Sequence, residues 1–206
     1  MNSRRILLVS VFFVSIFIAA RVFFSLISSI DSQLQDGLIQ AGQKSEEKGN
    51  FKDAIEKYQQ LSKIDRSYLP KVLLGRVYHK IGNDLSALEQ YQLALAKNMR
   101  GPQNNFWVHY LIGELYKDSS RYDQAIAKFK ELIDFPDTAK NSNESFGYAE
   151  YQKMAYRELG FCYAKTGEKQ KAVEAYEKYL FLTPSPKDLN EIRRDVQTLK
   201  DAQQIP

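Results

Sequence analysis

The chain has 206 residues, 44% of them apolar, which suits one globular domain with a short additional segment. Residues 1–30 contain three arginines and no acid, so residues 31–206, with 26 basic and 25 acidic residues, are nearly neutral. This balance excludes the basic excess that is typical of nucleic-acid-binding domains. The single cysteine, Cys162, excludes an intrachain disulfide, and with only two histidines the composition favours no metal site.

An apolar segment follows the basic residues at the N-terminus. Ile6–Ala20 is apolar apart from two serines, and after Arg21 the apolar character continues from Val22 to Ile30. Its first fifteen residues would rise about 22 Å as a helix, so crossing a hydrocarbon core of about 30 Å requires a run past Arg21. A soluble core helix is disfavoured because residues 6–20 have no polar face. We expect one transmembrane helix within residues 1–30, in contact with the membrane through residues 6–30.

We interpret this segment as an uncleaved signal anchor, because Ile18-Ala19-Ala20 is a poor signal-peptidase site. The alternative is a cleaved signal peptide that leaves a soluble periplasmic domain. Arg4 and Arg5 precede the apolar run, and Asp31 follows it closely. The positive-inside rule then predicts a single-pass membrane protein with a cytoplasmic N-terminus and the rest of the chain on the extracytoplasmic side.

An internal repeat occupies most of the remaining chain. Each copy has a glycine, an alanine twelve residues later and an aromatic residue four after the alanine: Gly42, Ala54 and Tyr58; Gly75, Ala87 and Tyr91; Gly113, Ala125 and Phe129; Gly160, Ala172 and Tyr176. Turn-forming residues lie between each glycine and its alanine, at Gly49-Asn50, Gly82-Asn83, Ser119-Ser120 and Gly167-Glu168. This spacing predicts antiparallel helix pairs. The small residues let two helices approach closely, and the aromatic residue fills the space between one pair and the next.

Two insertions interrupt the regular spacing. The intervals between successive alanines are 33, 38 and 47 residues, so the larger insertion follows the third copy, at about residues 137–148. Its residues Asp137–Gly147 are polar and rich in turn formers, and we expect them to form a solvated loop.

The pattern resembles the tetratricopeptide repeat, a helix–turn–helix unit of about 34 residues, and the resemblance covers about residues 35–184. It implies an all-α fold, a right-handed superhelix of four helical hairpins preceded by one transmembrane helix. The expected domains are the anchor (1–30), the repeat domain (31–184) and a C-terminal helix (185–206). The expected repeats are at about 35–68, 68–101, 106–139 and 153–186.

The C-terminal helix is predicted by apolar residues at helical spacing, Leu189, Ile192, Val196 and Leu199. We interpret it as a cap over the open apolar face of the last repeat, which stacked repeats require. The alternative is a helix that binds a partner.

Catalytic motifs are absent from the sequence. It contains no glycine-rich phosphate loop, no H-E-x-x-H and no G-x-S-x-G. Cys162 lies within the first helix of the fourth repeat, where a thiol more often packs than reacts. We therefore expect no enzyme activity, no cofactor and no metal.

The resemblance further implies a concave face lined by the first helix of each repeat. The residues carried over to that face as candidate partner-binding positions are Arg76, His79, Lys80, Trp107, Tyr110, Glu114, Lys117, Arg157, Phe161 and Lys165. The aromatic residues are candidate anchors, and the basic ones suit an acidic segment or a C-terminal carboxylate.

These features together predict a membrane-anchored scaffold that binds a peptide or partner protein and no nucleic acid. Assembly or maintenance of a bacterial envelope complex fits the anchor and its predicted orientation. The alternatives are a membrane receptor whose repeats face the cytosol and a fixed structural subunit of a membrane complex, since a fold does not by itself determine a partner.

Overall fold

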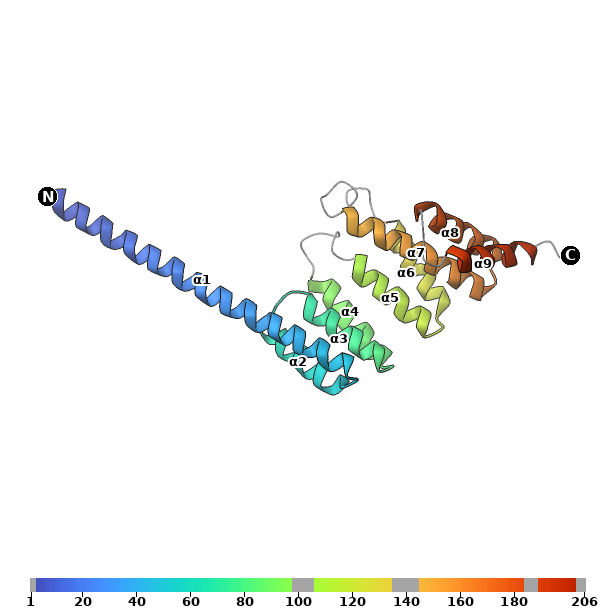
Figure 1. Cartoon of the computed structure of the whole chain (residues 1–206), viewed down its shortest axis with the longest axis horizontal. Coiled ribbons are helices and arrows are strands. Elements are labelled where there is room, and N and C mark those ends of the chain that lie inside the picture. The colour runs from blue at the N-terminus through green and yellow to red at the C-terminus, as the bar shows by residue number, and fades with distance from the viewer. Residues whose placement is uncertain (1–2, 98–105, 135–144, 184–188, 203–206) are drawn as a thin grey trace. The chain divides into compact units, whose positions relative to one another are not determined.

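The computed structural model describes residues 3–97, 106–134, 145–183 and 189–202, without the side chains of residues 1–16, 19 and 145–148. Every regular element in these ranges is a helix (Figure 1): α1 Ser3–Glu47, α2 Phe51–Ile64, α3 Leu69–Lys80, α4 Asp84–Lys97, α5 Phe106–Asp118, α6 Tyr122–Ile133, α7 Ser145–Thr166, α8 Lys169–Leu182 and α9 Leu189–Asp201. The chain divides into two compact units, Met1–Arg66 and Ser67–Pro206.

The predicted helix pairs are confirmed. The first unit contains the hairpin α1–α2, and the second contains α3–α4, α5–α6 and α7–α8. Gly49, Gly82 and Gly167 end the first helix of their hairpins with φ between 74° and 82°, and Ser120 takes the corresponding place with φ 58°. Glycine is favoured at these places because the left-handed conformation costs a residue without a Cβ atom little.

The interior of each hairpin is built on one contact between a glycine and an aromatic ring. A Cβ atom added to Gly113 would lie 2.5 Å from the ring of Phe129, and the same ring position is taken by Tyr58, Tyr91 and Tyr176 over the glycines of their own repeats. All four rings are buried. The ring thus fills the space left by the glycine in its own pair. Tyr91 and Phe129 also lie in the clusters that join their pair to the next one, as predicted.

The second unit has a continuous apolar core between successive hairpins. One cluster joins Ala87, Tyr91 and Ala94 of α4 to Val108, Ile112 and Leu115 of α5. A second cluster joins Ala125, Phe129 and Leu132 of α6 to Ala155, Leu159 and Cys162 of α7. The stacking follows from the spacing of apolar residues, because each helix has one stripe for its own partner and another for the preceding hairpin.

Helix α7 begins earlier than expected. The residues Ser145–Gly147 were predicted as the end of a polar loop, but they lie in the first turn of α7, and the remaining residues of that loop fall outside the described ones. The additional turns are held by packing: the ring of Tyr151 lies 5.7 Å from that of Tyr110 on α5, centroid to centroid. Tertiary contact thus extends a helix into a segment whose composition alone favours a turn.

Helix α1 continues through the expected boundary at residue 30, so the predicted anchor and the first repeat are not separate elements. The helix continues because no proline interrupts it and its isolated glycines, Gly37 and Gly42, are tolerated in a helix interior. Among the residues that the structure describes, no helix combines the length and apolar character needed to cross a membrane. The side chains of residues 1–16, which make up much of the predicted anchor, fall outside that description.

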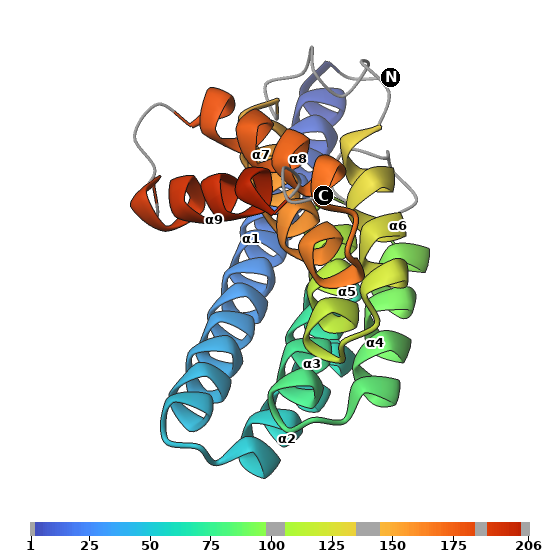
Figure 2. The ribbon, with the colours of Figure 1, turned by 90° about the vertical axis from the view of Figure 1, so that its right-hand side faces the viewer.

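Helix α9 packs along α8 at the end of the last hairpin (Figure 2). Ile192 and Val196 are buried against Val173, Tyr176 and Tyr179, and Leu199 lies at the margin of the same cluster. The apolar stripe read from the sequence thus covers the outer face of α8, where a further repeat would otherwise stack.

The contact between Gly113 and Phe129 can be tested directly. We expect Gly113→Ala to lower the free energy of unfolding by about 1 to 2 kcal/mol, because the added methyl group displaces a buried ring. Denaturant unfolding of the full chain, followed by circular dichroism, measures this effect. In a Phe129→Leu background, Gly113→Ala should lower the free energy of unfolding by clearly less. Equal losses in both backgrounds would contradict the contact between Gly113 and Phe129.

Candidate functional site

A network of charges joins the first helices of the third and fourth repeats. Lys117 of α5 donates a 2.6 Å hydrogen bond to Glu158 of α7, and its Nζ lies 3.5 Å from Glu114 and 3.8 Å from Asp118. Arg157 donates to the other carboxylate oxygen of Glu158 at 3.0 Å. The Glu158 side chain is only 6% exposed, so each of its oxygens needs the partner that it has.

For both Lys117 and Glu114, burial and the nearest opposite charge shift the pKa in opposite directions. Burial lowers the pKa of Lys117, but the hydrogen bond and charge of Glu158, together with Glu114 and Asp118, outweigh it and hold the pKa above its ordinary value. Burial raises the pKa of Glu114, the positive charge of Lys117 lowers it, and the net shift is upward. At neutral pH Lys117 is therefore firmly protonated, and the network acts as a fixed charged bridge between two repeats.

A pocket of about 230 Å³ opens beside this network, where α9 approaches the first-helix face of the repeats. Lys117, Arg157 and Phe161 lie on one side of it. Tyr176 and Ile192 provide apolar surface, and the acidic side chains of Glu158, Glu191 and Asp195 complete the lining. The pocket thus combines aromatic and apolar surface with charges of both signs.

Phe161 lies at the junction of this pocket with a second one. The second pocket has a volume of about 280 Å³ and is lined by Phe161, Lys165 and Tyr176 together with residues of α9. Phe161 is 38% exposed, and the ammonium group of Lys165 lies 5.3 Å from the centre of its ring. A partly exposed aromatic ring between two pockets is well placed to contact a partner.

The structure brings five of the ten predicted site residues into this region. Lys117, Arg157 and Phe161 line the first pocket, Phe161 and Lys165 the second, and Glu114 pairs with Lys117. Tyr110 is buried, donates a hydrogen bond to Glu114 at 3.2 Å and packs against Phe129, with the two rings tilted by 52°. It therefore supports the position of Glu114 from within the core.

The four remaining predicted residues lie elsewhere. His79 of α3 lies 3.4 Å from Asp118 of α5, so it links the second repeat to the third. Arg76 is half-buried and acts on the hydroxyl of Tyr91, and Lys80 is exposed at the end of α3. Trp107 packs at the edge of the core between α4 and α5. Partner binding by all ten residues stays a prediction.

Sequence reasoning missed Glu158, Tyr176, Glu191 and Asp195. Glu158 lies two positions before the repeat glycine, which the family pattern does not assign to the concave face. Tyr176 was assigned only to packing, although it lines both pockets. The acids of α9 carry no sequence signal for the site, because their place depends on how α9 docks on α8.

Two further kinds of chemistry can be assessed from the described residues: nucleophilic attack by Cys162 and metal binding by acidic side chains. Burial raises the pKa of the Cys162 thiol to about 12, so the thiolate needed for nucleophilic attack is scarce at neutral pH. Within the described ranges, no group of three or more metal-ligating side chains is arranged to hold a metal ion.

The contribution of the bridge through Glu158 to stability can be measured. We expect Glu158→Ala to lower the free energy of unfolding by about 3 kcal/mol, because it leaves the largely buried ammonium group of Lys117 without its closest partner. The matched control is Glu177→Ala, which removes an exposed pair with Lys200 at 2.6 Å and should cost less than about 1 kcal/mol. Both variants are measured by denaturant unfolding. Equal losses of unfolding free energy would show that the bridge stabilises the protein no more than the exposed pair does.

Comparisons with known proteins agree with this architecture. Two stretches match family models described as tetratricopeptide repeat, residues 108–135 in α5–α6 and residues 154–186 in α7–α8. A search of curated proteins found no match.

Solved structures with the same fold are known. One, described as a functional characterization of Pseudomonas aeruginosa PilF, is 21% identical over 84% of this chain and 71% of its own, with a TM-score of 0.64. A crystal structure of MamA protein is 21% identical over 84% of each chain, with a TM-score of 0.60. MamA from Desulfovibrio magneticus RS-1 is 16% identical over 82% of this chain and 90% of its own, with a TM-score of 0.57.

Identities at this level establish a shared fold and no shared partner. The matches identify residues 108–135 and 154–186 as tetratricopeptide repeats, and the glycine–aromatic contact of these two hairpins recurs in the other two. Stacked arrays of such repeats commonly form protein-binding surfaces.

Proposed function

We propose that this protein is a membrane-anchored scaffold that holds a peptide or partner protein against the first-helix face of its third and fourth repeats. The observation that carries the proposal is Phe161, a partly exposed ring set between two pockets and beside a fixed charged bridge. Aromatic anchors in such surroundings contribute most of the energy of protein interfaces.

The charged bridge supports the same proposal. Lys117 and Glu158 are held in place by each other and by neighbouring helices, so ordering them costs little when a partner arrives. Arg157 lies at the rim with its side chain 44% exposed, although one of its nitrogens already contacts Glu158.

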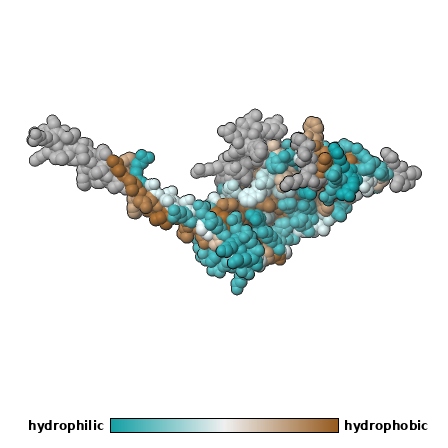
Figure 3. All heavy atoms as spheres, in the orientation of Figure 1, coloured by the Kyte–Doolittle hydropathy of each residue, from teal (hydrophilic) through white to brown (hydrophobic). Residues whose placement is uncertain are grey.

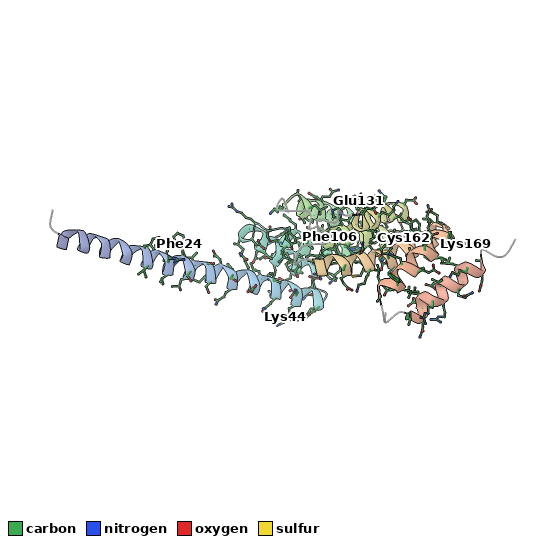
Figure 4. The ribbon with its side chains drawn as sticks, turned by 90° about the horizontal axis from the view of Figure 1, so that it is seen from above. Phe24, Lys44, Phe106, Glu131, Cys162 and Lys169 are labelled. Carbon is green, nitrogen blue, oxygen red and sulfur yellow. The ribbon has the colours of Figure 1, made fainter. Side chains whose placement is uncertain are left out.

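The membrane part of the proposal rests on α1. Between residues 17 and 27 the described side chains are almost all apolar and exposed, and Phe24 projects outward from the helix (Figure 4). The preceding run, Ile6–Ile16, is apolar apart from two serines in the sequence. A helix with apolar side chains on all sides is favoured in lipid and costly in water, which supports an anchor with a cytoplasmic N-terminus and extracytoplasmic repeats.

The wider setting that we propose is a bacterial envelope complex. The predicted orientation would place the repeats outside the cytoplasm, where a preformed protein-binding surface close to the membrane can assemble or maintain a larger structure. The similar folds of PilF from Pseudomonas aeruginosa and MamA from Desulfovibrio magneticus come from bacteria and are compatible with this setting.

The role of Phe161 can be tested with a closely matched control. Phe181 on α8 is 79% exposed and also has a lysine near its ring, Lys178 at 5.5 Å, but it lines neither pocket. We expect the full chain to capture a partner, and we expect the Phe181→Ala variant to retain it. The Phe161→Ala variant should bind the same partner at least tenfold more weakly, because truncating a central aromatic anchor costs about 2 kcal/mol or more of binding free energy.

The partner is identified by mass spectrometry, and its dissociation constant is then measured with the purified protein. If Phe181→Ala loses the partner and Phe161→Ala keeps it, the binding surface lies on the opposite side of α8. If neither substitution changes the affinity, the proposed site is wrong.

The proposed topology has its own test. Alkaline phosphatase, which is active only outside the bacterial cytoplasm, is fused after Pro206, and we expect the fusion to be active and to remain with membranes after alkaline carbonate washing. Activity that the wash releases into the soluble fraction would indicate cleavage, and an inactive fusion would place the repeats in the cytosol.

A further inference from the structure

In the third and fourth repeats, one stripe of the first helix always faces the preceding hairpin. Its positions lie five and one before the repeat glycine and two after it. In α5 they are Val108, Ile112 and Leu115, which pack on α4, and in α7 they are Ala155, Leu159 and Cys162, which pack on α6. A first helix in this fold therefore presents a surface for another pair of helices on this side.

In the first repeat the same three positions are Gly37, Ala41 and Lys44. The residues before Gly37 continue α1 as one helix and do not form a preceding hairpin. The side of α1 that would receive such a hairpin thus has no equivalent of α4 or α6 within the first unit. Whatever covers it must approach α1 closely, because two of the three positions carry small side chains.

Gly37 supports a close approach by a helix. A Cβ atom added there would have no neighbour within 4 Å, whereas one added to Gly42, on the adjacent side of α1, would lie within 2.3 Å of the Tyr58 ring. Glycine lowers the stability of an exposed helix relative to alanine, and nothing within the first unit requires it at this position. A small residue is favoured, however, where two helix backbones pack against each other.

Large apolar side chains continue the stripe towards the N-terminus. Figure 3 shows hydrophobic surface along the described part of α1. Phe23, Ile27, Ile30 and Leu34 are all exposed, Ile30 to 59%. Together with Gly37 and Ala41 they are spaced four, three, four, three and four residues apart. This seven-residue period is typical of a helix that pairs with another helix along a single seam.

Polar residues and charges lie away from the seam. Ser25, Ser29 and Ser32 fall on the opposite side of the helix by their spacing. From Val22 to Gln43 the only charged residues are Asp31 and Asp36, and neither occupies a seam position. The next position of the same spacing is the exposed Lys44, where the seam ends. Two copies of this segment can therefore meet along the seam without bringing like charges into contact.

We infer that α1 pairs in parallel with α1 of a second copy of this chain through the seam Phe23, Ile27, Ile30, Leu34, Gly37 and Ala41. A lipid surface does not account for the seam, because the seam extends past the apolar segment into the first repeat, where polar residues occupy the opposite side. A second copy presents the same seam in the same register, and a two-fold axis makes the contact self-complementary.

This pairing goes beyond the proposed binding face of the third and fourth repeats, with which the seam shares no residue. Its parallel direction rests on the proposed anchor, which would give both chains one orientation and raise their effective concentration in the membrane plane.

The test uses the full chain in its membrane, with Cys162→Ser to remove the native thiol. Single cysteines are introduced at the seam, Ile27→Cys, Ile30→Cys and Leu34→Cys, and at the matched opposite positions Ser25→Cys, Ser29→Cys and Ser32→Cys. After mild oxidation, disulfide-linked dimers are quantified by electrophoresis without reducing agent. We expect the seam cysteines to give at least fivefold more dimer than the serine positions.

Because a disulfide at one position joins the same residue of two chains, it reports parallel pairing in register. Equal yields on both sides of the helix, a maximum at the serine positions, or no dimer at any position would each overturn the proposal. As a second readout, Gly37→Leu should reduce the Ile30→Cys dimer severalfold while helical circular dichroism stays unchanged, and an undiminished dimer would show that close approach at Gly37 is not part of the contact. The phosphatase fusion and the Phe161 variants report on the anchor and the groove separately.

Discussion

The packing of one aromatic ring on one glycine sets the geometry of every hairpin in this protein. In all four repeats, a ring from the second helix occupies the volume that a side chain at the glycine would need. This contact fixes the distance and rotation of the two helices, and so determines which side of each first helix faces the neighbouring hairpin. The inter-hairpin clusters, and the surface left for a partner, follow from that arrangement.

The helix positions of the predicted partner-binding residues do not by themselves show what these residues contact. The charged bridge between Lys117 and Glu158 is an example. Lys117 and Arg157 look like ligands for an acidic partner when only their helix positions are considered. In the structure both contact Glu158, and Lys117 also has Glu114 and Asp118 close by. Much of the positive charge is thus balanced within the protein, so the proposal of partner binding rests more on Phe161 than on these basic residues.

Helix α1 combines features that are usually separate. Its C-terminal end belongs to the first hairpin, where Tyr58 packs on Gly42 and donates a 2.7 Å hydrogen bond to Glu46. Its described N-terminal part exposes apolar side chains that no element of the first unit covers. Because the helix is continuous, an anchor at one end and a repeat at the other would be joined without a flexible linker, so that pairing or tilting of the anchor would act directly on the first repeat.

The sequence by itself determined the repeat, the helix pairs and the turns, because glycine, alanine and aromatic spacing follow from local helix geometry and close packing. It also determined the apolar stripe of α9. Only the tertiary structure decided that α1 is one helix, that α7 begins at Ser145, that Tyr110 is buried and that Glu158 joins Lys117. These facts depend on contacts between residues far apart in the chain, such as Tyr110 with Tyr151 and Tyr176 with Ile192. Local periodicity cannot specify such contacts, because the register between neighbouring helices is set by how their side chains fit together.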